Sequence, residues 1–299
     1  MAALSKRCGK QPMNELEHLL NSLFIMATMV EARDPYTGGH LWRVSQYCRV
    51  LAGRGGLPPS QVARISLGGF LHDLGKIAVP DAILNKPDRL TDGEYEIIKT
   101  HPEVGRRLLT DHPLAELAES AVFAHHERPD GTGYPLRLPH ERISTDARIV
   151  GICDAFDAMT STRPYRKGMP AQKALDIIKD NLGTQFDSEW GLLFLELGAA
   201  GKLDHIAGHS EPGIPMHDCP MCSAPMVVRR SQREGDHAYC RGCGAETEIR
   251  LTDGNAVIEA TGRRGTPAQL EPEVDVDLVR ELVKESATLL AEFSLRSRA

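Results

Sequence analysis

Long hydrophobic runs are missing from this sequence of 299 residues. The richest apolar stretch, Leu16 to Val30, is interrupted by Glu17, His18 and Asn21, so it is too polar and too short to span a bilayer. The first residues, MAALSKRCGK, lack the apolar core of a signal peptide. Net positive charge is absent as well, and the net charge of −6 argues against binding nucleic acid through bulk charge. We therefore expect a cytoplasmic protein that contacts neither membrane nor nucleic acid.

Alternating strand patterns are absent before residue 200, which predicts an all-helical domain for the first two thirds of the chain. Asn14 to Ala32 has apolar residues at helical spacing. Ser60 is the expected N-cap of a helix that carries His72 and Asp73 at its end and stops at Gly75. A further helix is expected to follow His40 and to end near residues 54–56, and another is expected to start at Pro102. The remaining helices are expected over 91–101, 114–127, 144–160, 170–182 and 187–198.

Seven residues that can bind metal are spread through this part of the chain, at expected helix ends or faces. They are His40, His72, Asp73, His101, His125, His126 and Asp154. A lone buried histidine is more often a core residue than a ligand, and a second His-Asp pair at 217–218 shows how common that dipeptide is. The joint pattern is more specific, because neutral imidazoles with carboxylates suit a pair of divalent first-row transition metals. Two such metals held by His and Asp typically hydrolyse a phosphate ester.

Asp73 directly follows His72, so its two carboxylate oxygens could bridge two metals while the imidazole binds one. Lys76 lies one turn further on, where its ammonium could face a phosphate oxygen or the leaving group. A solvated lysine at a helix C-terminus is the simpler alternative for Lys76, because a cation is favourable there. Asp157, one turn after Asp154, either orients a ligand or the attacking water, or lies on the helix surface.

Residues 33 to 186 resemble an HD-GYP domain, a branch of the HD phosphohydrolase superfamily. The matching segments are, in order, LHDLGKIAVPDAIL, KPDRLT, His101-Pro102, HHERPDGTGYP and DAFDAMTSTRPYR. The resemblance implies an all-helical bundle that hydrolyses cyclic di-GMP through a metal-bridged hydroxide, either to pGpG or further to GMP. It also implies that the metals are iron or manganese.

The resemblance also implies a role for each site residue. The seven residues given above match the metal ligands, and Asp73 matches the bridging carboxylate. Asp73 and Lys76 are the implied catalytic residues, with Lys76 contacting substrate phosphate. The other implied substrate-binding residues are Gly133, Tyr134, Pro135, Arg163 and Arg166. Some relatives hold a third metal with a glutamate at the position of Tyr36, so two metals are expected here.

Four of the seven cysteines form two CxxC pairs, Cys219 with Cys222 and Cys240 with Cys243, separated by 17 residues. In a cytosolic chain this spacing predicts a zinc ribbon, a small antiparallel sheet that holds one structural zinc on four thiolates. The zinc either substitutes for a core too small to fold alone or supports a docking module. Acidic residues offset the basic ones near the cysteines, which favours structure or protein contact over nucleic acid.

The expected domain division has five parts: an N-terminal helix packing on the catalytic domain (1–32), the catalytic domain (33–200), a linker (201–217), the zinc ribbon (218–262), and a linker with an amphipathic helix (263–299). The last helix carries Val279, Leu282, Leu289 and Phe293 at heptad positions. It either pairs with its copy in a homodimer or packs on the catalytic domain.

Two other functions stay open. One is hydrolysis of another cyclic dinucleotide or phosphate ester at the same site. The other is a non-catalytic adaptor that binds nucleotide, or partner proteins such as GGDEF-type signalling proteins, through the GYP residues or the ribbon. The presence of every expected ligand and of Lys76 favours the enzyme.

Overall fold

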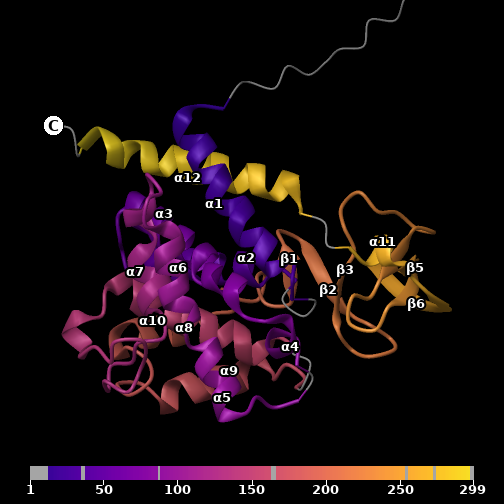
Figure 1. Cartoon of the computed structure of the whole chain (residues 1–299), viewed down its shortest axis with the longest axis horizontal. Helices are drawn as coiled ribbons and strands as arrows, with labels where there is room; N and C mark the ends of the chain where they lie inside the picture. The colour runs from indigo at the N-terminus through magenta and orange to yellow at the C-terminus, as the bar shows by residue number, and fades with distance from the viewer. Residues whose placement is uncertain are drawn as a thin grey trace, which may run out of the picture.

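A computed structural model describes residues 13–34, 38–86, 88–162, 166–252, 255–271 and 274–296, with side chains up to residue 290. A helical domain comes first, two small antiparallel sheets follow, and a long C-terminal helix lies across the helical domain (Figure 1). This arrangement confirms the predicted mainly α fold. In the described part of the chain, every helix is too short or too polar to cross a membrane.

The elements follow one another along the chain in this order. The α-helices are α1 (Glu15–Glu31), α2 (His40–Arg54), α3 (Pro59–Leu71), α4 (Asp81–Leu84), α5 (Asp92–Ile98), α6 (His101–Leu109), α7 (Glu119–Ala124), α8 (Thr145–Thr160), α9 (Ala171–Asp180), α10 (Ser188–Ala199), α11 (Pro267–Leu270) and α12 (Val276–Arg296). The 3-10 helices are η1 (Leu74–Ala78), η2 (Ala115–Leu117) and η3 (His140–Arg142). The strands are β1 (His209–Glu211), β2 (Ile214–Asp218), β3 (Pro225–Val227), β4 (His237–Tyr239), β5 (Ala245–Thr252) and β6 (Asn255–Arg264).

Several helices begin where local capping chemistry predicts. α5 starts after Thr91, whose hydroxyl accepts from the backbone N–H of Glu94 while the Glu94 carboxylate accepts from Thr91 N–H. This reciprocal pair satisfies two donors that the first turn would otherwise leave free. α8 starts after Ser144, whose hydroxyl accepts from Ala147 N–H. Both starts agree with the sequence analysis.

Other predicted boundaries are wrong. α3 begins at Pro59 after the N-cap Pro58, not after Ser60, because proline fits the first helical turn without needing a hydrogen bond. The same helix ends at Leu71, so Gly75 does not stop it and lies inside η1. The helix expected over 91–101 ends at Ile98. The helix expected over 114–127 is divided into η2 and α7.

The core of the helical domain lies between α2, α3 and α8. Tyr47 of α2, Phe156 of α8 and Phe194 of α10 meet edge to face, with ring centroids 5.1 to 6.2 Å apart. Phe24 of α1 packs in the same way on Phe70 of α3, with ring centroids 4.8 Å apart. These contacts hold α2, α3 and α8 in the positions from which site residues project.

α12 packs on the helical domain, which is one of the two arrangements that the heptad pattern left open. The helix crosses α1 and contacts α3 (Figure 1). Its residues Val279, Leu282, Val283 and Leu290 are buried in the main core. The expected homodimer through this helix stays a prediction.

The C-terminal module consists of two three-stranded antiparallel sheets, β1–β2–β3 and β4–β5–β6. The first CxxC pair lies in the turn between β2 and β3, and the second lies between β4 and β5. The linker expected over 201–217 instead contains β1 and most of β2. Strand pairing therefore brings this Gly- and Pro-containing segment into the first sheet.

Candidate metal centre

The seven predicted ligands come from separate elements and converge on one centre. They lie at the start of α2 (His40), between α3 and η1 (His72 and Asp73), at the start of α6 (His101), just after α7 (His125 and His126) and within α8 (Asp154). Five of them are buried, and His126 and Asp154 are half-buried. Helix ends thus carry most of the candidate ligands.

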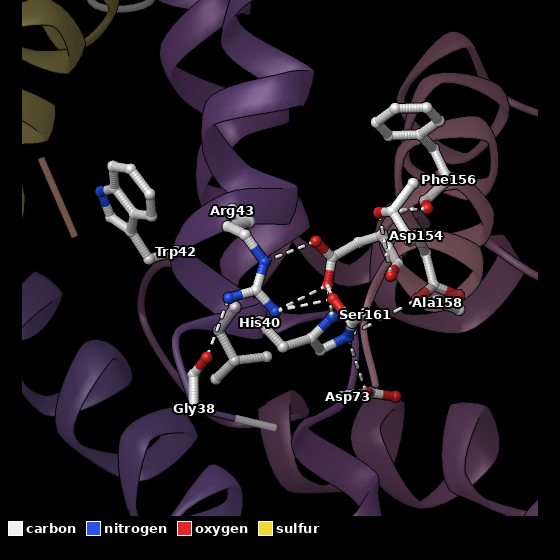
Figure 2. Close-up of polar contacts among 12 residues, drawn as sticks. Gly38, His40, Trp42, Arg43, Asp73, Asp154, Phe156, Ala158 and Ser161 are labelled. Carbon is white, nitrogen blue, oxygen red and sulfur yellow. Dashed lines mark hydrogen bonds and ion pairs between the residues drawn. The ribbon is translucent and has the colours of Figure 1, made fainter. Parts of the chain in front are cut away.

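One group of donor atoms surrounds Asp73 Oδ2. The Nε2 atoms of His40 and His72 lie 3.5 and 3.3 Å from this oxygen. Asp154 Oδ1 lies 3.5 Å from His40 Nε2 (Figure 2). It also lies 3.6 Å from His72 Nε2. The donor atoms of His40, His72 and Asp73 lie within 4.8 Å of one another, close enough to share one cation, and Asp154 forms a similar group with His72 and His125.

A second group consists of His101, His125 and His126, whose ligand atoms all lie within 4.8 Å of one another. His101 Nε2 is 3.2 Å from His125 Nε2. The other carboxylate oxygen of Asp73, Oδ1, lies 3.6 Å from His101 Nε2. The two oxygens of Asp73 therefore face different groups, as a carboxylate that bridges two metals must.

Hydrogen bonds at Nδ1 direct the Nε2 atoms toward the centre. A ring that donates from Nδ1 is left with an unprotonated Nε2, the form that can bind a metal. The Nδ1 bonds run from His40 to Asp157 Oδ2 (2.7 Å), from His72 to Gly69 O (2.7 Å), from His101 to Ile98 O (2.7 Å) and from His125 to Val122 O (3.0 Å).

The protonation of the histidines also suits metal binding. Burial lowers the pKa of His101 to about 3 and that of His126 to about 4, and burial holds the pKa of His125 well below its usual value. These rings are neutral near pH 7. Burial opposes a proton on His72 too, but the carboxylates of Asp73 and Asp154 outweigh it and raise the pKa of His72. A cation would take the place of that proton.

The donor set fits divalent metals. Nε2 of His40 and Nε2 of His72 are buried and make no hydrogen bond within the described part of the chain. A buried polar atom without a partner is costly, and metal coordination removes that cost. Imidazole nitrogens mixed with carboxylate oxygens match iron, manganese or zinc better than calcium or magnesium.

Asp157 and Arg43 form a buried support behind His40. Figure 2 shows Arg43 beside the His40 ring. Asp157 Oδ2 accepts from His40 Nδ1 at 2.7 Å. Arg43 holds the same carboxylate with Nε on Oδ1 at 2.6 Å and a terminal nitrogen on Oδ2 at 3.0 Å. Asp157 thus orients a ligand, which is one of the two roles that the sequence analysis left open for it. Arg43 was missed, although its place one turn after His40 was a usable signal.

A cavity of about 520 Å³ opens beside the ligands His125, His126 and Asp154. Tyr95 and Lys99, which the sequence analysis did not select, line it. The Lys99 ammonium lies 5.5 Å from the centroid of the Tyr95 ring, in reach of a cation–π contact. The cavity therefore offers aromatic faces and positive charge next to the metal ligands.

Of the GYP residues, 133–135, Gly133 and Tyr134 form part of one wall of this cavity. Tyr134 stacks on His126 with ring centroids 4.6 Å apart, and its backbone N–H donates to His126 O. A Cβ at Gly133 would lie 2.6 Å from His126 O, so only glycine permits this close approach. Pro135 follows through a cis peptide bond and is not among the lining residues. The Glu127 carboxylate holds the loop in place by accepting hydrogen bonds from the backbone N–H groups of Leu136 and Leu138.

Lys76 is an ion-pair partner of Asp73 rather than a solvated lysine. Its Nζ lies 2.6 Å from Asp73 Oδ2, and its side chain is about three quarters buried. The ammonium is the largest favourable influence that holds the pKa of Asp73 well below its usual value against burial. Lys76 therefore keeps the central carboxylate ionised.

The predicted basic pair is described only in part. Arg166 donates to the carbonyls of Ala158 and Met159 near the end of α8, and it does not line the cavity. Arg163 lies outside the described residues. So does Tyr36, and the expectation of two metals rather than three stays a prediction.

The four cysteines gather at one point, as predicted. Sγ of Cys219 lies 3.8 Å from Sγ of Cys243, and Sγ of Cys222 lies 3.6 Å from Sγ of Cys240. Zinc bound tetrahedrally to four sulfurs at about 2.3 Å has edges of about 3.8 Å, so the four thiols fit this ion. Both turns are alike, because the residue after the second cysteine, Ser223 or Gly244, has a positive φ.

Comparison with known proteins agrees with this geometry. A family model described as an HD domain matches residues 25–190, more than half of the chain. A cyclic di-GMP phosphodiesterase of Pseudomonas aeruginosa is 45% identical over 147 residues, which are 49% of this chain and 36% of that protein. The cyclic di-GMP phosphodiesterase response regulator RpfG of Xanthomonas campestris is 39% identical over 178 residues, 58% of this chain and 47% of its own.

A third relative has a different substrate in its name. A 3'3'-cGAMP-specific phosphodiesterase of Vibrio cholerae is 39% identical over 162 residues, which cover 54% of this chain and 35% of that protein. The chain thus spans less than half the length of each of these three relatives.

Proposed function

Because this chain belongs to the HD domain family, we propose that it is a metal-dependent phosphodiesterase for cyclic dinucleotides, and that it opens cyclic di-GMP either to pGpG or further to GMP. One observation carries the proposal: the two carboxylate oxygens of Asp73 face two separate groups of ligands beside a cavity. Two divalent metals suit phosphodiester hydrolysis, and the matched relatives bear phosphodiesterase names.

The residues of the chain prepare the centre for this reaction. When bound, divalent metals supply Lewis acidity toward phosphoryl oxygens and activate water near neutral pH. His40, His72 and Asp154 would hold one metal, and the three histidines of the second group would hold the other, with Asp73 between them. Lys76 keeps Asp73 ionised and adds positive charge where the phosphodiester carries negative charge.

The cavity suits a nucleotide that reaches the centre from the GYP side. A base can stack on an aromatic ring, and Tyr95 and Tyr134 both line the cavity. Lys99 and Arg148 add positive charge to the same wall, although Arg148 also pairs with Asp187 at 3.0 Å. These residues would orient the ligand while a phosphate meets the metal ligands at the inner end.

Substrate choice is the finer part of the proposal. Cyclic di-GMP and 3'3'-cGAMP share the phosphodiester ring and differ in one base, so the same metal chemistry serves both. Two of the relatives described above are named for cyclic di-GMP, and one is named for 3'3'-cGAMP. We place cyclic di-GMP first and keep 3'3'-cGAMP as the alternative.

The test is turnover by protein purified anaerobically and loaded with iron(II) or manganese(II), with cyclic di-GMP and 3'3'-cGAMP assayed side by side. Asp73→Ala removes the carboxylate between the two ligand groups, so we expect at least a thousandfold loss of turnover. Asp218→Ala is the matched control, because Asp218 follows His217 in the same dipeptide but is exposed on β2. It should keep the wild-type rate.

Other results would change the proposal. A faster reaction with 3'3'-cGAMP would replace the substrate and keep the mechanism. Activity that survives in Asp73→Ala would contradict the role of the metal centre. Tight nucleotide binding without turnover in fully loaded protein would favour the adaptor, acting on nucleotide or on GGDEF-type partners.

A further inference from the structure

The first sheet of the C-terminal module touches the buried support of His40. One terminal nitrogen of Arg43 donates to the carbonyl of His209 in β1 at 2.9 Å and to Gly38 O at 2.8 Å. The same nitrogen lies 3.3 Å from the sulfur of Met216 in β2. Arg43 is 1% exposed, so β1 and β2 contact a side chain that lies inside the helical domain.

Arg43 connects this sheet to the metal centre through a single intermediate. Its other two nitrogens hold both oxygens of Asp157, and Asp157 accepts from Nδ1 of His40. The planar guanidinium makes these contacts together because its donors are fixed in one fork. A shift of β1 would move or free one arm of the fork, and the orientation of Asp157 and His40 would change with it.

The module also holds the chain segment that leads to His40. Gly39, with φ +73°, lies so close to β1 that a Cβ there would be 2.4 Å from Ser210 Cα. At the other end of the segment, Arg241 in the second CxxC turn donates to the carbonyl of Ala32, just after α1. Both halves of the module therefore contact the segment between α1 and α2.

β1 is connected to the four-cysteine site through β2. β1 pairs with β2, β2 ends at Asp218, and Cys219 follows at once in the turn that leads to β3. The buried apolar cluster of the module contains alanine, cysteine and one methionine. A core this small gains little from burial, so a metal on the cysteines supplies much of its stability.

We propose that the four-cysteine site controls the affinity of the His40 ligand group for its divalent metal, through β1 and Arg43. A cation on the cysteines fixes β1, β1 fixes Arg43, and Arg43 fixes Asp157 and the His40 ring. Coupling of this kind is reciprocal, so each metal strengthens the binding of the other. The inference rests on the metal centre of the proposed function, but not on its substrate.

The test is a manganese(II) titration followed by electron paramagnetic resonance of the free ion, on full-length protein loaded with one equivalent of zinc. The proteins are wild type, Cys222→Ser with Cys243→Ser, Arg43→Lys, and the combination. Loss of groups that orient a ligand typically weakens metal affinity about 10- to 100-fold. We therefore expect the cysteine double variant and Arg43→Lys each to raise the larger of the two manganese dissociation constants at least tenfold. In the Arg43→Lys background the cysteine changes should add less than about twofold.

Arg54→Lys is the control, since Arg54 lies on the same helix and pairs with Glu196 at the surface. Arg43→Lys keeps all four cysteines, so it tests the link even if the serine variant misfolds. Amide hydrogen exchange should rise at residues 38–44 and 209–218, and not across α8, in either variant. Unchanged manganese affinity in folded Arg43→Lys, or independent effects that multiply, would overturn the coupling. Absent turnover with normal coupling would count against the proposed function alone.

Discussion

At the scale of single residues, the ligand histidines are oriented in two different ways. His72, His101 and His125 each donate from Nδ1 to the carbonyl three residues earlier, in the last turn of the preceding helix. His40 opens α2, so no helical turn precedes it, and its Nδ1 bonds to Asp157 of α8 instead. The orientation of the His40 ring therefore depends on a tertiary contact, whereas these three rings are held by local contacts.

Asp157→Ala should be strongly destabilising, because it leaves the Arg43 guanidinium buried without its carboxylate. Removing one partner of a buried pair costs about 3–5 kcal/mol. Asp81→Ala breaks an ion pair with Arg33 in which the Asp81 side chain is 70% exposed, and it should cost less than about 1 kcal/mol. Urea unfolding of both variants checks the difference, and equal losses would contradict the buried role of Asp157.

At the scale of elements, the contact between η1 and α6 brings the two ligand groups together. Gly75 of η1 faces the start of α6, and a Cβ on it would lie 1.8 Å from His101 O and 2.5 Å from Gly105 N. Gly105 faces back in the same contact. Glycine is needed at residue 75 for backbone approach, not to end a helix, and this approach sets the distance between Asp73 and His101.

Gly75→Ala should push α6 away from η1. Overpacking of this kind typically costs about 1–3 kcal/mol, and we expect one catalytic metal to be lost because His101 moves from Asp73. Gly93→Ala is the matched control: its Cβ would meet nothing within 4 Å inside α5, where alanine gains about 0.5–1 kcal/mol over glycine. Thermal unfolding and metal counting on both proteins test this; a Gly75→Ala protein with full metal content would argue against it.

At the scale of the whole molecule, α12 packs its apolar side against other helices of the same chain. It lies over α1 and α3 and buries Val279, Val283 and Leu290 in the main core. Because these residues are already covered, α12 has less apolar surface left for pairing with a second copy. The helix and the first sheet thus attach the C-terminal third to the helical domain at two separate places.

Leu290→Ala should lower the free energy of unfolding of the helical domain by about 2–5 kcal/mol, the usual cost of emptying a buried leucine position. Leu192→Ala makes the same change where the side chain is 54% exposed, and it should have little effect. Urea unfolding monitored by far-UV circular dichroism distinguishes the two. A near-neutral Leu290→Ala would show that α12 does not stabilise the domain.

Features that depend on neighbouring residues were predictable from the sequence alone. The helix starts after Thr91 and Ser144 follow from side chains that cap their own first turn. The four cysteines were grouped correctly because two short turns hold them. The seven candidate ligands were also selected from the sequence, with motif resemblance assigning their roles, and the structure brings them together.

Features that depend on distant residues were decided only by the tertiary structure. The segment that contains β1 and β2 looked like a linker because it carries several Gly and Pro residues, and only strand pairing makes it part of a sheet. Arg43 bonds Asp157 and His209, 114 and 166 residues away, and no local pattern announces those partners. Local chemistry therefore determined which residues can bind metal. Long-range packing decided how His40 is oriented, and it brought the C-terminal module into contact with Arg43, which supports His40 through Asp157.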